Sequence, residues 1–294
     1  MRIFVTGASG FIGSAVVPEL LGAGHQVLGL ARSEAAAKAL VAAGAEVHRG
    51  QLDDLESLRV GAAKADGVIH LAFIHNFANF EASLKAEFAA VQALGDALVG
   101  TEKPFAIASG LLGVAPGRLA VETDAAPTEW PRGRSETILK ELAAKGVRTS
   151  AIRLAPTVHG SGDHGFVHML IETARAKGAA AYIGEGANRW PAVHRKDAAR
   201  LFRLALERGP AGSTFHAAAE EGVTAKEIAT AIGAGLGLPV VGKTPAEAMD
   251  HFGGFMGWAF GMDAPTSSAA TRKQLGWAPS EPMLLEDVKA HYFR

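Results

Sequence analysis

Three glycines near the start of the chain are spaced for phosphate binding. They follow a short apolar run at residues 3–5 and precede a helical pattern at residues 14–21. A strand, a tight turn and a helix in that order direct backbone N–H groups and the positive end of a helix dipole at a pyrophosphate. The turn therefore predicts a dinucleotide site. Its expected contacts are Gly7, Ser9, Gly10, Phe11, Ile12 and Gly13.

The end of the second predicted strand, residues 26–31, carries Arg32 and Ser33. In dinucleotide-binding folds an acidic residue near this point binds the ribose 2′-hydroxyl of NAD, whereas a basic residue suits the 2′-phosphate of NADP. A guanidinium and a hydroxyl both donate to phosphate. We therefore expect NADP as the cofactor. The same residues also fit a second interpretation, in which Arg32 faces solvent and Ser33 caps a helix over residues 35–43.

The sequence of the turn, Thr6-Gly-Ala-Ser-Gly-Phe-Ile-Gly13, is similar to the N-terminal segment of the extended short-chain dehydrogenase/reductases, also called the epimerase/dehydratase superfamily. The resemblance continues through residues 66–73 and 152–160 to a Leu-Gly-Trp-Ala-Pro closure at residues 275–279. It implies further cofactor contacts near the adenine, along the fourth strand and beside the nicotinamide. These contacts are Gln51, Leu52, Leu71, Ala72, Phe73, Pro156, Thr157 and Val158.

The resemblance also implies catalytic positions. The fifth predicted strand, residues 104–110, ends where relatives carry a serine that hydrogen-bonds the substrate carbonyl, and Ser109 matches it. Relatives then supply Tyr-x-x-x-Lys, in which the tyrosine transfers the proton and the lysine holds the ribose and lowers the tyrosine pKa. The two tyrosines of this chain, Tyr182 and Tyr292, are not followed four places later by lysine. We therefore expect the dyad to be absent.

Aligning the next helix on the family pattern puts Arg132 at the tyrosine position and Glu136 at the lysine position. A guanidinium stays charged at any usable pH, so Arg132 is expected to stabilise an oxyanion rather than to transfer a proton. Glu136 beside the nicotinamide would favour its cationic, oxidised form. In a second interpretation both are exposed residues of a helix start, with Ser135 as the N-cap and Glu136 in the first turn.

Two histidines are candidate proton donors in place of the missing tyrosine. His159 matches a tyrosine at the end of the family's sixth strand, and His75 lies in the loop after the fourth. Imidazole has a pKa suited to proton transfer near neutral pH. Each residue has a second interpretation: His159 as a packing residue, and His75 as part of a polar loop leading into a helix over residues 80–99.

Substrate contacts are expected at the carboxyl end of the sheet, where open α/β sheets bind ligands, and from the segment that the family folds over substrate. The candidates are Asn76, Tyr182, Asn188 and Trp190. Residues 249–262 are rich in methionine and aromatic side chains. This segment suits either a lid over an apolar substrate or a loop packed on its own domain.

These sites require a doubly wound parallel α/β sheet of the Rossmann type, with a smaller C-terminal α/β substrate domain. Strand and helix patterns alternate through the first half of the chain, which predicts parallel strands with helices on both faces. The NADP-binding domain is expected at residues 1–158, with residues 191–218 returning to it. The substrate domain is expected at residues 159–190 and 219–294.

Composition excludes several classes of protein. With 294 residues, 48% hydrophobic and 20% charged, the chain is globular, and its net charge of −1 predicts no nucleic-acid partner. No apolar run reaches the about 18 residues of a membrane span, so we expect a soluble, cytoplasmic protein without a membrane partner. The absence of cysteine excludes disulfides and thiolate catalysis, and no metal site is expected.

The predicted function is that of an NADPH-dependent oxidoreductase that passes a hydride to a small, fairly apolar carbonyl or related acceptor. A regulatory protein that senses NADP(H) without catalysis is the alternative from a different class. By resemblance, helices over residues 80–99 and 135–145 would form a homodimer interface.

Overall fold

The computed structural model of this chain describes residues 1–74, 79–127, 130 and 132–293. The described strands are β1 (Arg2–Thr6), β2 (Gln26–Ala31), β3 (Glu46–Arg49), β4 (Gly67–His70), β5 (Pro104–Gly110), β6 (Arg148–Leu154), β7 (Thr157–His159), β8 (Ala180–Ile183), β9 (Arg189–His194), β10 (Ser213–Ala217), β11 (Glu220–Thr224) and β12 (Val240–Lys243). The described helices are α1 (Gly13–Gly22), α2 (Glu34–Ala42), α3 (Leu55–Ala63), α4 (Phe80–Asp96), α5 (Gly133–Ala144), α6 (Phe166–Lys177), α7 (Arg195–Arg208), α8 (Ala225–Leu236), α9 (Pro245–Phe252), α10 (Gly254–Phe260), α11 (Ala269–Leu275) and α12 (Leu284–His291).

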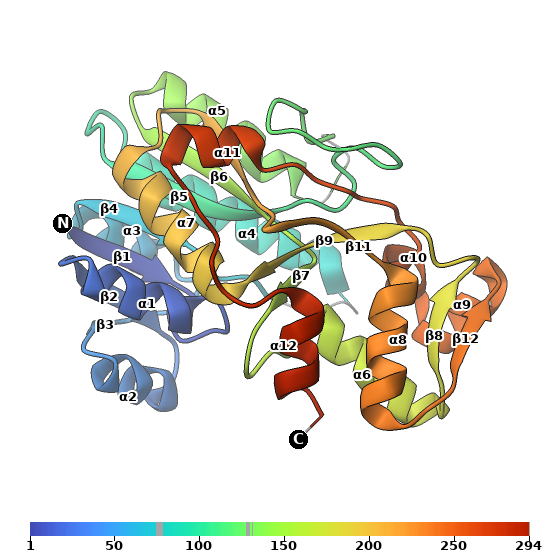
Figure 1. The fold of residues 1–294 in the computed structure, drawn as a ribbon. Helices are drawn as coiled ribbons and strands as arrows, with labels where there is room; N and C mark the ends of the chain where they lie inside the picture. The colour runs from blue at the N-terminus through green and yellow to red at the C-terminus, as the bar shows by residue number, and fades with distance from the viewer. Residues whose placement is uncertain (75–78, 128–129, 131, 294) are drawn as a thin grey trace.

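A seven-stranded sheet in the order β10-β6-β5-β4-β1-β2-β3 forms the large layer of the fold, and its paired strands are parallel (Figure 1). Alternate residues of β1 point to opposite faces. Ile3 and Val5 pack into a core with α1, α2 and α7, whereas Phe4 packs into a second core with α3, α4 and α5. Helices therefore cover both faces of a parallel sheet, which confirms the predicted doubly wound fold.

The second half of the chain builds a smaller α/β region beside the carboxyl ends of the large sheet (Figure 1). It holds a three-stranded sheet, β11-β9-β7, and a two-stranded sheet, β12-β8. Side chains of α6, α8, α10 and α12 share a separate hydrophobic core around the buried Trp190. Between these segments, α7 and β10 return to the large sheet.

Several elements differ from their predicted bounds. The strand predicted at residues 66–73 ends at His70, and the Ala72 N–H beyond it donates to the side-chain hydroxyl of Thr6 at 3.3 Å. The segment 249–262 is not a loop, because α9 and α10 occupy most of it. Ser135 is not an N-cap: α5 begins after Arg132, and Ser135 is buried inside the helix.

Local capping fixes the starts of other helices. Ser33, Asp54 and Thr224 each accept a backbone N–H three residues later, at the starts of α2, α3 and α8. The Ser33 cap confirms one of the two roles expected for that side chain. None of the helices within the described residues combines the length and apolarity that crossing a membrane requires.

Candidate dinucleotide and active site

The glycine turn after β1 is closed against its neighbours. Gly7 has a φ of +66°, and a Cβ there would lie 2.8 Å from the backbone nitrogen of Ala72. A Cβ at Gly13 would overlap the carbonyl oxygen of Gly7, and the Gly10 N–H donates to that same oxygen at 2.9 Å. Side chains at the first and third glycines would therefore push the turn apart.

The start of α1 is suited to an anion. Within the described residues, α1 has no side-chain cap and no acid in its first turn. The Ser14 and Ala15 N–H groups donate to the carbonyls of Gly10 and Ile12, so the N–H groups of residues 11–13 are the ones that an anion at this helix start would use. Ser9 and Gly10 are exposed on the turn, and Phe11 and Ile12 are half-buried beside it. The predicted turn residues thus form a cradle that fits the diphosphate of a dinucleotide.

The residues expected around the adenosine lie on neighbouring strand ends. Arg32 is exposed directly after β2, and the Ser33 hydroxyl caps α2 by accepting from the Ala36 N–H at 3.2 Å. Gln51 is exposed after β3, whereas Leu52 packs partly against the core beneath α3 and α4. Arg32 and Gln51 therefore both present polar groups to solvent at the edge of the sheet that carries the glycine turn.

The segment after β4 connects the glycine turn to the rest of the site. The Ala72 N–H donates to the Thr6 hydroxyl at 3.3 Å, and that hydroxyl also bonds Nδ1 of His70 at 2.7 Å. Burial, aided by the nearby charge of Arg132, lowers the pKa of His70 to about 3. His70 is therefore a neutral core histidine, and its hydrogen bond helps to hold the backbone of residues 71–73 against the turn.

Arg132 lies between the segment after β4 and the carboxyl-terminal half of β5. Its Nη2 donates to the carbonyl of Ala108 at 2.7 Å and forms an ion pair with Oε1 of Glu87 at 2.9 Å. Its guanidinium carbon lies 4.6 Å from the ring centre of Phe73. Glu87 is fully buried on α4; burial raises the pKa of this carboxyl, and the charge of Arg132 opposes that shift. Arg132 is thus anchored by a carbonyl, a carboxylate and an aromatic face.

Ser109, near the end of β5, donates its hydroxyl hydrogen to Oε1 of Glu136 at 2.7 Å. Both side chains are buried. A serine hydroxyl has a single hydrogen to donate. The predicted hydrogen bond from Ser109 to a substrate carbonyl therefore requires that the Glu136 contact be broken. In this conformation Ser109 offers only its lone pairs.

Glu136 is compensated by a buried arginine from β6. Nε and Nη2 of Arg153 donate to the two carboxylate oxygens of Glu136 at 2.9 and 2.7 Å. Arg153 Nη1 also lies 3.3 Å from Nε2 of His216 on β10. Glu136 is therefore buried and is not an exposed residue of the first turn. The prediction that its charge favours an oxidised nicotinamide required an uncompensated carboxylate, whereas Arg153 compensates this one.

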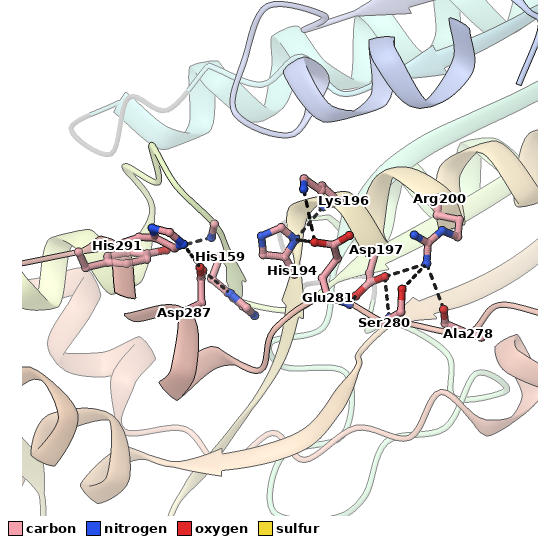
Figure 2. A network of polar contacts seen from close by, with 12 residues as sticks. His159, His194, Lys196, Asp197, Arg200, Ala278, Ser280, Glu281, Asp287 and His291 are labelled. Atoms are coloured by element: carbon pink, nitrogen blue, oxygen red, sulfur yellow. Dashed lines mark hydrogen bonds and ion pairs between the residues drawn. The ribbon is translucent and has the colours of Figure 1, made fainter. Parts of the chain in front are cut away.

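The segment after β6 serves the three-stranded sheet. Pro156 and Val158 are half-buried, and the Thr157 hydroxyl donates to the carbonyl of Pro191 at 2.6 Å. His159 is buried, and its Nδ1 lies 2.8 Å from Oδ2 of Asp287 on α12. Figure 2 shows the Asp287 carboxylate between His159 and His291. These contacts favour the packing interpretation of His159 over its role as a proton donor.

Asp287 stays ionised within this cluster. Burial opposes its ionisation most strongly, but the hydrogen bond from His159 and the charges of His159, His194 and His291 together lower the pKa of the carboxyl. The ring of His159 also meets that of His194 edge-on, with centres 5.3 Å apart. Within the described residues, no three His, Asp or Glu side chains are grouped to hold a metal ion.

The expected substrate residues in the second half of the chain are held by contacts inside the smaller region. Lys226 lies over the Tyr182 ring at 5.4 Å, and Asn188 Nδ2 donates to the carbonyl of Phe260 at 2.7 Å. Trp190 is buried against Phe260, with ring centres 5.1 Å apart. These side chains support the walls of the region. The predicted catalytic His75 and substrate residue Asn76 lie outside the described residues.

Aromatic side chains form a continuous wall beyond Arg132. Ring centres lie 6.0 Å apart between Phe73 and Phe80, 6.4 Å between Phe80 and Phe255, and 5.8 Å between Phe255 and Trp258. Trp258 also stacks on Trp130 at 5.5 Å. Phe255 and Trp258 on α10 are 36% and 46% exposed, so part of this aromatic wall lies at the surface.

Sequence reasoning missed the buried partners of the site, above all Glu87 and its pairing with Arg132. A signal was present in the sequence. Glu87 stands between Ala86 and the apolar run Phe-Ala-Ala-Val (residues 88–91), where an apolar residue would be expected on the buried face of a helix. A buried carboxylate there requires a cation from elsewhere in the fold.

The fold and this site define an α/β protein with a dinucleotide-binding turn. Residues 3–106 match the model of the NAD dependent epimerase/dehydratase family. The chain is 49% identical over 291 residues to an uncharacterized protein of Schizosaccharomyces pombe, with 98% of each chain covered. It is 27% identical to the 4-hydroxy-2-methyl-3-oxo-4-farnesyl-3,4-dihydroquinoline-1-oxide ketoreductase of Stigmatella aurantiaca, over 73% of this chain and 67% of the relative.

Among solved structures, dTDP-glucose 4,6-dehydratase (DesIV) of Streptomyces venezuelae, with NAD and TYD bound, is similar with a TM-score of 0.78. The alignment covers 99% of this chain and 95% of that one at 19% identity, which supports the fold. The family match and the named relatives support a place in the NAD(P)-dependent epimerase/dehydratase superfamily. These relationships support an enzyme of the oxidoreductase type.

Proposed function

We propose that the protein is an NADPH-dependent oxidoreductase that transfers a hydride to a small, fairly apolar carbonyl or related acceptor. The observation that carries the proposal is a series of contacts from the glycine turn to α5. Gly7 meets Ala72, the neighbouring Phe73 lies beneath Arg132, and Arg132 donates to the strand residue before Ser109. The series joins the predicted cofactor site to polar groups suited to a reacting carbonyl.

Bound NADPH would supply the hydride, and side chains of the protein would manage the charge that forms on the acceptor oxygen. Arg132 has five N–H groups, more than the Ala108 carbonyl and Glu87 engage, and a guanidinium stabilises a developing oxyanion. Ser109, whose hydrogen goes to Glu136, would accept a hydrogen bond from a donor group. The proton that completes the alcohol would come from water or from His75.

The preference for NADP over NAD rests on Arg32 and Ser33. Within the described part of the chain no carboxylate is paired with Arg32, and its side chain is exposed at the end of β2. The Ser33 oxygen accepts from Ala36, which leaves the hydroxyl hydrogen for a phosphate. Both features favour a 2′-phosphate at this position.

The apolar character of the acceptor follows from the aromatic wall on α10. Partly exposed aromatic rings bind flat or apolar ligands and exclude water from the reacting centre. The ketoreductase of Stigmatella aurantiaca is named for a 3-oxo-dihydroquinoline oxide that carries an apolar farnesyl chain. We propose that an acceptor of this general character, smaller in size, lies against Phe255 and Trp258.

The test is NADPH oxidation against a panel of aldehydes, ketones, enones and imines, with variants at position 132. Arg132→Met in an E87Q background removes both members of the ion pair and should lower kcat/KM by roughly 10²- to 10³-fold, as the loss of an oxyanion donor does. E87Q alone and Arg134→Met, an exposed neighbour on α5, should keep most of the activity. Wild-type activity in the R132M/E87Q variant would rule out this role for Arg132.

The sensor alternative is less favoured, because the relatives with named activities are reductases and dehydrogenases. If the protein bound a dinucleotide but turned over no acceptor, the sensor function would be favoured over the oxidoreductase. A homodimer through α4 and α5, a cytoplasmic location and the domain boundaries at residues 158, 190 and 218 stay predictions.

A further inference from the structure

The N-terminus of α7 brings a side chain from the second half of the chain to the glycine turn. α7 packs beside α1 (Figure 1), and its first residue is Arg195. Arg195 Nη1 lies 3.4 Å from the hydroxyl of Ser14, in the first turn of α1. Its guanidinium carbon lies 5.2 Å from the ring centre of Phe11, in the glycine turn itself. Arg195 therefore reaches the predicted diphosphate site from a distant part of the sequence.

The charge of Arg195 is not compensated. Within the described residues, no carboxylate forms an ion pair with it, whereas Lys196 pairs with Glu281 at 3.5 Å (Figure 2). Arg203, further along α7, pairs with Glu19 of α1 at 2.7 Å. An unpaired guanidinium beside the positive end of α1 is electrostatically unfavourable unless an anion lies between or beside them.

The loop after β7 fixes the direction of this side chain. A Cβ at Gly160 would lie 3.1 Å from Cγ and Cδ of Arg195, so the backbone passes close over the arginine stem. His164 from the same loop meets the Phe11 ring edge-on, with centres 5.8 Å apart. The stem is thus held between residues 160–164 and the glycine turn, with the guanidinium over Phe11. This preorganisation lowers the entropic cost of binding a phosphate.

We propose that Arg195 binds the diphosphate of the dinucleotide through charge-assisted hydrogen bonds, in addition to the backbone N–H groups of the glycine turn. The inference rests on the proposed dinucleotide-binding function. Because the diphosphate is common to NADP and NAD, Arg195 contributes equally to both, unlike Arg32, which contributes through the 2′-phosphate. Arg195 also couples the cofactor to the loop at residues 160–164 and to α7.

The experiment measures dissociation constants for NADPH and NADH by fluorescence titration of the purified protein. R195M keeps the stem over Phe11 but removes the charge, and should weaken both cofactors by the same factor, roughly tenfold to a hundredfold, as the loss of charge-assisted hydrogen bonds does. R195K should be intermediate. R203M, which breaks the ion pair between Arg203 on α7 and Glu19 on α1, should bind both cofactors as the wild type does.

A third ligand separates the roles of the two arginines. Adenosine 2′-monophosphate lacks the diphosphate, so its displacement of NADPH should give the same inhibition constant in wild type and R195M. An equal loss for this ligand in R195M, or unchanged NADPH affinity in R195M, would overturn the inference while leaving the proposed function intact. Failure of the wild type to bind any dinucleotide would overturn both.

Discussion

The buried charges around the predicted site occur in pairs. Glu87 faces Arg132, and Glu136 faces Arg153. Taking a charge out of water costs several kcal/mol, and the partner offsets this cost only while it is present. The two ion pairs therefore constrain the site more strongly than its exposed residues do, and substitutions in them should be judged as pairs.

Breaking the Glu136–Arg153 pair should destabilise the fold. R153M leaves a buried carboxylate without a cation and should lower the free energy of unfolding by about 3–5 kcal/mol. The double variant R153M/E136Q removes both charges and should recover part of that loss. Urea unfolding measures these values. E172Q, which removes the exposed partner of Arg175, should cost no more than about 1 kcal/mol. If R153M lowered the free energy of unfolding by no more than E172Q does, burial of the Glu136–Arg153 pair would not control its contribution to stability.

His70 should make stability depend on pH. Its pKa is about 3 in the fold, so between the ordinary histidine pKa of about 6.5 and pH 3 the unfolded chain binds a proton that the folded chain does not. Its contribution therefore lowers stability as pH falls below 6.5, by up to about 1.4 kcal/mol per pH unit. Unfolding of wild type and H70N at pH 4 to 7 tests this. The difference in free energy of unfolding between wild type and H70N should become smaller or change sign as the pH falls. If the free energies of the two proteins fall in parallel with pH, the predicted effect of His70 is wrong.

Among the secondary-structure elements, α10 has the clearest link to substrate choice. It follows α9 directly, buries Met256 and Phe260 in the core of the smaller region, and leaves Phe255 and Trp258 at the aromatic wall. The alternation of buried and exposed residues on this short helix is why residues 249–262 are rich in large apolar side chains. The core needs one face, and we propose that an acceptor uses the other.

Shortening the aromatic wall should weaken acceptor binding more than chemistry. W258A should raise the KM of apolar acceptors by roughly tenfold, with little change in kcat. A tenfold change corresponds to about 1.4 kcal/mol of binding free energy, which the lost apolar contact would account for. Acceptors that are small and polar should respond less. Met283→Ala, which truncates an exposed methionine before α12, is the matched control. An equal response for polar and apolar acceptors would argue against contact with Trp258.

The sequence allowed local elements to be predicted well where neighbouring residues decide them. β2 and β5 have the predicted bounds, because short apolar runs ended by turn or polar residues are typical of buried strands. The caps at Ser33 and Asp54 were also predictable, since capping acts over three residues. The end of β4 was not, because the backbone beyond it bonds the side chain of Thr6, which lies on another strand.

Across the entire fold, the glycine turn and the doubly wound sheet were predictable, but the side-chain partners within the site were not. Ser109 and Glu136 are 27 residues apart in the sequence, and Arg195 and Ser14 are 181 apart. Periodicity reports which face of an element is buried, but not what faces it. Whether Ser109 can donate to a substrate therefore depends on Glu136, a partner that only the folded arrangement supplies.

The Glu87–Arg132 pair restricts how this sequence can change over evolutionary time. A tyrosine introduced at position 132 alone would leave the Glu87 carboxylate buried in α4 without its cation. A lineage could therefore exchange arginine for tyrosine here only together with, or after, neutralisation of position 87. We expect these two positions to covary among descendants of a common ancestor, so that arginine at 132 is inherited with glutamate at 87.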